Sequence, residues 1–258
     1  MNKVTRLKYY IESLCIYDFE DDDVFSALYD LLCDDEEDTV ALQSYFFKEL
    51  AKNESLKKHI SRLILTNDNI FTKAACAGKV GELSIAVMNA VKSDLAKLEE
   101  IASLTAQDII AGVDDDEIKE ILLTLPGWEV GKALAPLDKN WDKQIDELVK
   151  YHRENGYGIY AKNIAFTWRD EEITPVNSID TIRLTDLKNY ELQRNKVIDN
   201  TESFIAGHPA NNVLLYGDRG TGKSSTVHAI LNEYWQKGLR MIEIPKSAVA
   251  DLSLIREQ

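Results

Sequence analysis

Gly217-Asp218-Arg219-Gly220-Thr221-Gly222-Lys223-Ser224 fits the pattern G-x-x-x-x-G-K-[ST], which is the phosphate-binding P-loop. The apolar run 212–216 before it predicts a buried β-strand, and residues 224–237 after it predict a helix. Strand, glycine-rich turn and helix together are the context in which this motif binds phosphate. The alternative interpretation is a glycine-rich turn that caps a helix and binds nothing. We predict a phosphate-binding loop.

The chemistry expected of this loop follows from its residue types. Glycines let backbone N–H groups close around phosphate oxygens, and the dipole of the following helix favours an anion at its N-terminus. Lys223 is predicted to reach the β- and γ-phosphates, and the Ser224 hydroxyl to bind Mg²⁺. We assign no catalytic residue. The predicted site consists of Gly217, Asp218, Arg219, Gly220, Thr221, Gly222, Lys223, Ser224 and Ser225.

The bulk composition places limits on the class of protein. The chain has 258 residues, enough for two domains, and its 45% hydrophobic and 29% charged residues are typical of a globular protein. No segment approaches the ~20 consecutive apolar residues of a membrane helix, and the first residues lack an apolar signal core. Cys15, Cys33 and Cys76 have no metal-ligand spacing. We expect a cytoplasmic protein with buried, reduced thiols and no membrane contact.

Acidic residues are concentrated in the first part of the chain. Residues 1–150 hold 17 Lys and Arg against 30 Asp and Glu, a formal charge of −13, whereas residues 151–258 hold 13 against 14. Such an acidic surface disfavours the phosphate backbone of nucleic acids, so no direct nucleic-acid contact is expected. Three acidic clusters, at 21–23, 34–38 and 114–117, precede helical patterns and are interpreted as helix caps rather than metal sites.

Residues 7–150 show helical periodicity almost throughout. Apolar side chains recur on one face in several segments, and Thr105 with Asp108 predicts a capping box. Residues 1–150 are therefore predicted to form an all-α domain whose apolar stripes are its core. The recurring positions are Val24, Leu28, Leu31 and Leu32; Leu42, Tyr45, Phe46 and Leu50; Leu56, Ile60, Leu63 and Ile64; and Leu83, Val87, Val91, Leu95, Leu98 and Ile101.

The pattern changes near residue 150. Residues 156–160 indicate a loop, 164–168 a strand, 175–178 a turn and 179–184 a second extended segment. We interpret 151–185 as a linker with short strands. A helix is predicted over 186–205, and residues 240–244 are predicted to form a strand parallel to 212–216, completing a βαβ unit. Gly238 stands where a helix C-cap is expected, and a further helix is predicted from Asp251.

Two stretches resemble known ATP-binding proteins. The run 213–224, with its Gly-Thr-Gly-Lys-Ser core, resembles the Walker A motif of AAA+ ATPases, and residues 184–191 (Leu-Thr-Asp-Leu-Lys-Asn-Tyr-Glu) resemble the lead-in segment that lies beside adenine in that family. A closer resemblance is to a bacterial AAA+-type ATP-binding family filed as domain of unknown function 815. It is carried by residues 200–204, 210–225 and 239–246, and is strong over roughly 180–250.

The resemblance implies an all-α N-terminal domain followed by the first part of a three-layer α/β/α P-loop NTPase domain over 186–258, with ATP and Mg²⁺ as ligands. Only 34 residues follow Ser224, and they include no strand ending in the acidic pair that holds Mg²⁺ and positions water for hydrolysis. The chain therefore resembles a C-terminally truncated AAA+ protein. We expect an ATPase only if the missing part is present.

Two main functional hypotheses remain open from the sequence, beside a weaker third, a helicase-loader-like role, because helicase loaders of AAA+ type have similar Walker A loops. In the first, the chain binds ATP as part of a homo-oligomeric AAA+ ATPase that remodels a protein or nucleoprotein partner, with the helical domain contacting an unknown protein. In the second, the acidic helical part is a protein-interaction module and the P-loop is vestigial. His208 before the P-loop, Trp168 and Tyr160 at the domain junction, and the isolated His59 and His152 are interpreted as structural residues.

Overall fold

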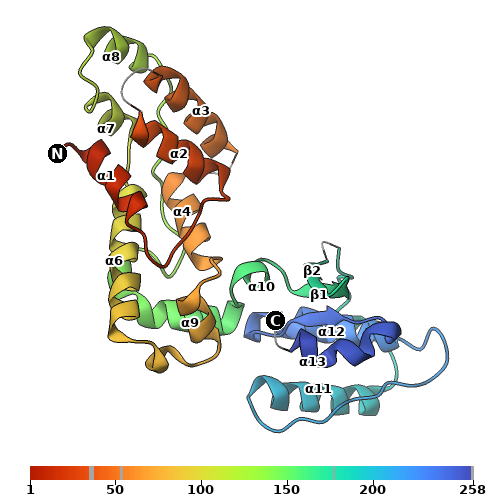
Figure 1. Cartoon of the computed structure of the whole chain (residues 1–258). Helices are drawn as coiled ribbons and strands as arrows, with labels where there is room; N and C mark the ends of the chain where they lie inside the picture. The colour runs from red at the N-terminus through yellow and green to blue at the C-terminus, as the bar shows by residue number, and fades with distance from the viewer. Residues whose placement is uncertain (35–37, 53–54, 177, 257–258) are drawn as a thin grey trace. The chain divides into compact units, whose positions relative to one another are not determined.

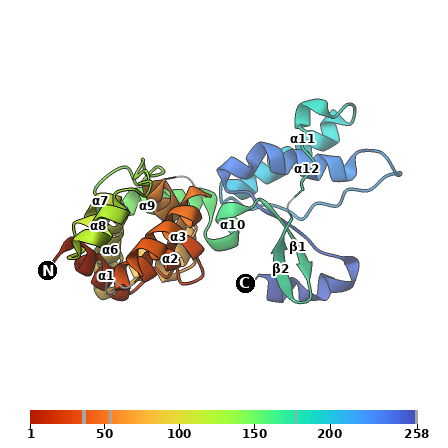
Figure 2. The same cartoon turned by 90° about the horizontal axis from the view of Figure 1, so that it is seen from above.

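The chain consists of two compact units, Met1–Arg153 and Glu154–Gln258. The computed structural model describes residues 1–34, 38–52, 55–176 and 178–256. Figures 1 and 2 show the elements of both units in two views. Each unit is described by itself below. Within the described residues, no helix is both long enough and apolar enough to cross a lipid bilayer.

The described part of the first unit is built from helices and contains no β-strand. Short 3₁₀ turns at Val80–Glu82 and Trp141–Lys143 join some of the helices. The α-helices are α1 (Lys3–Glu12), α2 (Asp23–Cys33), α3 (Thr39–Ala51), α4 (Leu56–Leu65), α5 (Ile70–Cys76), α6 (Ile85–Ile101), α7 (Ala106–Ile110), α8 (Asp116–Leu122) and α9 (Ile145–Asn155).

Most of the predicted apolar stripes form one core in this unit. The four stripe residues of α2 are all buried, and so are Leu56, Ile60 and Ile64 of α4. On α6 the buried stripe residues are Val91, Leu95, Leu98 and Ile101. The prediction for α3 is wrong at Tyr45, which is 48% exposed. Gln43 is buried on α3 instead, because the inward face of this helix is rotated from the apolar stripe.

Residues 123–140 depart from the predicted helical pattern. This segment is irregular, as Pro126, Gly127 and Pro136 would dictate. It nevertheless belongs to the core, since Leu137 is fully buried. Its backbone carbonyls at 129 and 130 accept hydrogen bonds from the first N–H groups of α4, at 3.0 and 2.9 Å. An irregular segment thus caps a helix start that has no side-chain cap of its own.

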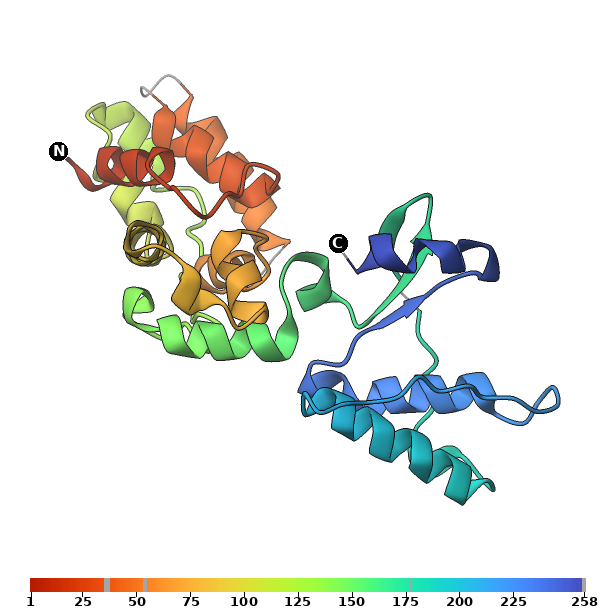
Figure 3. The ribbon, with the colours of Figure 1, turned by 60° about the horizontal axis from the view of Figure 1, so that its bottom comes forward.

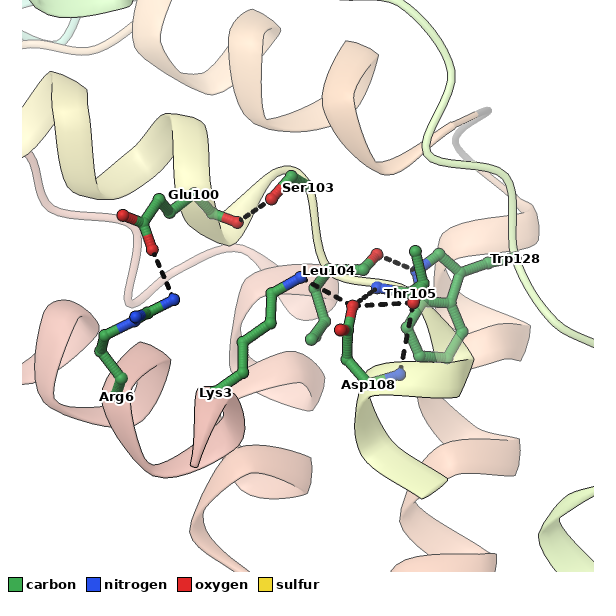
Figure 4. Close-up of polar contacts among 8 residues, drawn as sticks. All are labelled: Lys3, Arg6, Glu100, Ser103, Leu104, Thr105, Asp108 and Trp128. Atoms are coloured by element: carbon green, nitrogen blue, oxygen red, sulfur yellow. Dashed lines mark hydrogen bonds and ion pairs between the residues drawn. The ribbon is translucent and has the colours of Figure 1, made fainter. Parts of the chain in front are cut away.

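Polar contacts tie α1 to the end of α6 and to α7 (Figure 4). The predicted capping box is confirmed, because the Asp108 carboxylate accepts from the Thr105 backbone N–H at 2.9 Å and the Thr105 hydroxyl interacts with the N–H of Asp108. Lys3 adds an ion pair to the same carboxylate at 2.7 Å. Burial alone would raise the pKa of Asp108, but the hydrogen bonds from Lys3 and Thr105 outweigh it, so this pKa lies below its usual value.

A buried carboxylate organises the turn after α1. Asp94 of α6 is fully buried and accepts hydrogen bonds from the backbone N–H groups of Cys15, Ile16 and Tyr17 at 2.9, 2.7 and 3.4 Å. Lys97 lies 3.6 Å from its other oxygen. The expectation that the three thiols are buried is wrong: Cys15 is exposed, and Cys33 and Cys76 are only partly buried.

In the described residues, side chains of the acidic clusters cap the starts of helices. Asp22 caps α2 through the N–H of Phe25, and Asp115 caps α8, as predicted. The cluster at 34–38 lies partly outside the described residues. Asp22 also corrects the interpretation of His59 as isolated, because its Oδ1 lies 2.8 Å from His59 Nε2. The described residues contain no group of three metal-ligating side chains.

The second unit contains a three-stranded sheet with helices. Its strands are β1 (Ala165–Arg169), β2 (Glu172–Pro175) and β3 (Met241–Glu243), in the order β2-β1-β3. β1 and β2 are an antiparallel hairpin with Thr167 opposite Thr174, and β3 is parallel to β1 with Ile242 opposite Phe166. The helices are α10 (Gly158–Lys162), α11 (Glu191–Ile205), α12 (Lys223–Tyr234) and α13 (Leu252–Ile255).

The main correction in this unit concerns residues 212–216. They are not a buried strand, because Leu214 and Tyr216 are 83% and 88% exposed and the segment pairs with no strand in the described part of the chain. β3 is formed as predicted, but its parallel partner is β1 instead. A strand needs a neighbour to satisfy its backbone groups, and the hairpin β1–β2 has taken that role for β3.

Some of the other local predictions for the second unit are confirmed and others are wrong. The strand predicted at 164–168 is β1. Gly238 has φ 92° and is the C-cap of the 3₁₀ turn Trp235–Lys237, which directly follows α12, so the expected cap lies at the end of this turn. Residues 158–162 are helix α10 rather than a loop, and residues 179–183 are irregular. Trp168 is buried in the sheet, where its indole N–H donates to Asp251 at 3.0 Å, so its interpretation as a core residue is confirmed.

Candidate functional site

The P-loop has a backbone conformation that requires its glycines. Gly217, Gly220 and Gly222 have φ of 142°, 85° and 82°, in the region that side chains disfavour. A Cβ at Gly220 or Gly222 would meet nothing within 4 Å. Close packing therefore does not explain why glycine occupies these positions, whereas the positive φ angles of the loop do. Such a loop leaves open space beside its peptide groups.

Helix α12 starts directly at the end of this loop. Gly222 is its N-cap, and its carbonyl accepts hydrogen bonds from the backbone N–H and the hydroxyl of Thr226 at 2.8 and 2.9 Å. The N–H groups of residues 223–225 belong to the first turn, where an α-helix offers no backbone acceptor. They are available to an anion, and the helix dipole adds a partial positive charge at this point.

The Lys223 side chain folds back over the loop. Its ammonium donates to the carbonyl oxygens of Gly217 and Asp218 at 2.9 and 2.6 Å and lies 3.3 Å from the Thr221 hydroxyl. The Thr221 hydroxyl donates to the Asp218 carbonyl at 2.9 Å. These acceptors are neutral, and a phosphate oxygen would be a stronger, charged acceptor for the same ammonium. Lys223 is therefore held close to the space that the loop surrounds.

A cavity of about 280 Å³ opens beside this loop. Five of the nine predicted site residues line it: Gly217, Asp218, Thr221, Gly222 and Lys223. The other four, Arg219, Gly220, Ser224 and Ser225, are not among its lining residues. The side chains of Arg219 and Ser224 are exposed to solvent.

The opposite wall of the cavity comes from the segment before α11 and the first turns of that helix. It is lined by Leu187, Lys188, Asn189, Tyr190, Gln193, Arg194 and Val197, with Leu215 and Tyr216 beside the loop. Figure 3 shows that α11 and α12 lie side by side and begin at the same end of the unit. Residues far apart in sequence therefore meet at one site.

The start of α11 differs from its prediction. A helix was expected from residue 186, but a 3₁₀ turn at Leu184–Asp186 is followed by an irregular stretch, and α11 begins at Glu191. Asn189 and Tyr190 have φ of 65° and 56°. Two consecutive non-glycine residues in this region break any helix. The resemblance pointed to residues 184–191, but Arg194 and Val197 had no sequence signal beyond their position on the helix.

The remaining candidates lie away from the cavity. His208 is exposed, and Tyr160 packs on the Phe166 ring at a centroid distance of 5.0 Å. None of the histidines or tryptophans in the described residues lines the cavity. The site therefore consists of backbone groups, one lysine and short polar side chains, facing a wall that is partly apolar.

Comparison with known proteins gives a family match for the C-terminal part of the chain. Residues 161–258 match a family model described as Protein of unknown function (DUF815). No curated protein and no solved structure matches the chain. The resemblance to this family, predicted from residues 180–250, is thus confirmed for the C-terminal part of the chain. The family's description assigns no activity, and the relation to AAA+ proteins remains a prediction.

Proposed function

We propose that the second unit binds a nucleoside triphosphate, ATP, with its phosphates in the loop Gly217–Ser225. The observation that carries the proposal is the combination of three glycines in the left-handed region with a helix N-terminus and a lysine held over the same loop. Backbone N–H groups, a positive helix end and an ammonium are the groups that bind phosphate anions. The adjoining cavity leaves room for the nucleoside part.

We also propose Mg²⁺, which accompanies triphosphates in P-loop proteins; the exposed Ser224 side chain lies outside the cavity lining and would have to turn toward the phosphates to bind the ion. The Ser224 hydroxyl stands in the first turn of α12, and we propose it as the one protein ligand of the ion, with phosphate oxygens as the others. Among the residues that the structure describes, Asp218 is the only acidic one lining the cavity, and it belongs to the loop itself. The proposal is accordingly one of binding, and it assigns no residue to hydrolysis.

The P-loop and the segment before α11 also suggest a class of protein. We propose that the second unit is an ATP-binding module of AAA+ type, as the residues of the P-loop and its lead-in segment suggest. In such a protein, the acidic first unit would contact a protein partner and the ATP-binding units would assemble as a homo-oligomer. The charge of residues 1–150 supports a protein partner over a nucleic acid.

The test is equilibrium binding of MgATP to the full chain by isothermal titration calorimetry. Replacing Lys223→Ala removes the ammonium from the loop and is expected to weaken binding at least about tenfold, the effect of losing ~1.4 kcal/mol of charged hydrogen bonding. Lys246→Ala is the matched control, because Lys246 is exposed and not a cavity residue. Ser224→Ala is expected to reduce the gain in affinity that Mg²⁺ gives. Unchanged affinity in Lys223→Ala refutes the phosphate site.

A further inference from the structure

The wall opposite the P-loop contains a backbone turn in an unfavourable conformation. Asn189 and Tyr190 both have left-handed backbone angles, with φ of 65° and 56°. Asparagine tolerates this region, but a tyrosine there is strained by contact between its Cβ and the neighbouring carbonyl. Both residues line the cavity, and the Tyr190 side chain is 58% exposed. Such a turn persists only when surrounding groups hold it.

One side chain holds this turn. The Arg194 guanidinium donates from Nη1 to the carbonyl oxygen of Leu187 at 2.8 Å and lies 3.4 Å from that of Asn189. The Arg194 backbone N–H also donates to the Tyr190 carbonyl at 3.0 Å, as the first turn of α11. Arg194 is half-buried and lines the cavity itself. Its hydrogen bonds go to neutral carbonyls of the turn.

The position of the turn relates it to the part of a ligand that the P-loop does not bind. The loop and the start of α12 receive the phosphates on one side of the cavity. The other side offers the apolar side chains of Leu187 and Val197 together with the Tyr190 ring. Flat, largely apolar groups such as a nucleobase bind against such a surface. The 187–190 turn therefore forms the nucleoside end of the cavity.

We propose that Arg194 is a positioning residue for the nucleoside: by binding the Leu187 and Asn189 carbonyls, it holds the left-handed turn in the conformation that shapes this end of the cavity. The inference rests on the proposed function, since it assumes phosphates in the P-loop. It predicts that Arg194 contributes to the binding of a nucleotide but not to the binding of a phosphate chain alone.

The experiment compares two ligands, MgATP and magnesium tripolyphosphate, on the full chain by calorimetry. Arg194→Ala is expected to weaken MgATP binding about tenfold and to change tripolyphosphate binding less than about twofold. Lys196→Ala is the control, because it removes the same charge from an exposed position of α11 that does not line the cavity. It is expected to leave both affinities unchanged. Circular dichroism of each variant shows that its helices are retained.

A second variant keeps the test valid if Arg194→Ala fails to fold. Arg194→Lys retains the charge and a donor for the carbonyls, so it is expected to weaken MgATP binding by less than the alanine variant and to leave tripolyphosphate binding unchanged. Equal losses for both ligands in either variant would make Arg194 a phosphate-binding residue and overturn the inference. An unchanged MgATP affinity in Arg194→Ala would overturn it also. If the unmodified chain binds neither ligand, the proposed function itself fails and the inference with it.

Discussion

Replacing Gly222→Ala separates backbone strain from ligand binding at the P-loop. Gly222 has φ 82° and is the N-cap of α12, and a Cβ added there would meet no atom within 4 Å. The substitution therefore creates no clash within the chain. It places a methyl group beside the cavity, at a residue that lines it.

The expected loss of stability is small and can be worked out. An L-residue in the left-handed region costs about 1–2 kcal/mol. The lower conformational entropy of the unfolded alanine chain returns about 0.4–1 kcal/mol of this. The net destabilisation of the second unit is then ~1 kcal/mol. The effect on nucleotide binding is expected to be larger, because the methyl group occupies space that phosphates need or the loop moves to a negative φ and turns its N–H groups away.

Gly207→Ala is a matched control for this prediction. Gly207 has φ 74°, follows α11, and a Cβ there would also meet nothing within 4 Å. It carries the same backbone strain but does not line the cavity. Urea unfolding of the full chain is expected to show similar destabilisation in both variants. Calorimetry is expected to show MgATP affinity reduced more than about tenfold in Gly222→Ala only. Equal affinities in the two variants would refute the reasoning.

Two further predictions concern the first unit. Asp94→Ala removes a fully buried carboxylate and leaves the N–H groups of residues 15–17, of which Tyr17 is buried, without their acceptor. Urea unfolding is expected to show a loss of roughly 3 kcal/mol; a loss below about 1 kcal/mol would contradict it. Burial tends to raise the pKa of Asp22, but hydrogen bonds from His59 and the Phe25 N–H lower it overall. Its contribution to stability is then present above the unfolded carboxyl pKa of about 4 and disappears as the pH falls. The stability advantage of the wild type over Asp22→Asn is therefore expected to shrink as the pH falls below about 5, and an advantage independent of pH would refute this assignment.

The features that were predictable from the sequence are local ones. The stripe of α2 and the capping box at Thr105 depend on residues three or four apart, which a helix brings together whatever the rest of the chain does. The positive φ angles of Gly217, Gly220 and Gly222 follow from the motif for the same reason. In each case the residue types leave few alternative conformations.

The features that could not be predicted depend on distant partners. Residues 212–216 are apolar and β-branched in part, so they favour a strand locally, but a strand exists only where another strand pairs with it. The chain pairs β3 with β1 instead, across more than seventy residues. The hydrogen bonds from the backbone N–H groups of residues 15–17 to Asp94 join segments 77 to 79 residues apart. Nothing in the local sequence indicates that this aspartate is buried.

The wall of the candidate site was predicted only in part, for a related reason. The left-handed conformation of Tyr190 is one that its residue type disfavours, so a helix from residue 186 was the better local interpretation. The turn exists because Arg194, four residues further on, binds its carbonyls. Sequence reasoning identified the phosphate side of the cavity from its glycines, and the resemblance indicated residues 184–191, but neither indicated the left-handed turn or the role of Arg194.

The most direct test of the central claim is amide hydrogen–deuterium exchange of the full chain with and without MgATP. Binding in the P-loop is expected to slow exchange at residues 217–226, where free N–H groups would take phosphate acceptors, and at 187–194 on the opposite wall. Exchange in α4 of the first unit is expected to stay unchanged. Slowed exchange confined to these two segments would support an ATP site between the P-loop and the start of α11. Saturating MgATP with no change at 217–226 would contradict it.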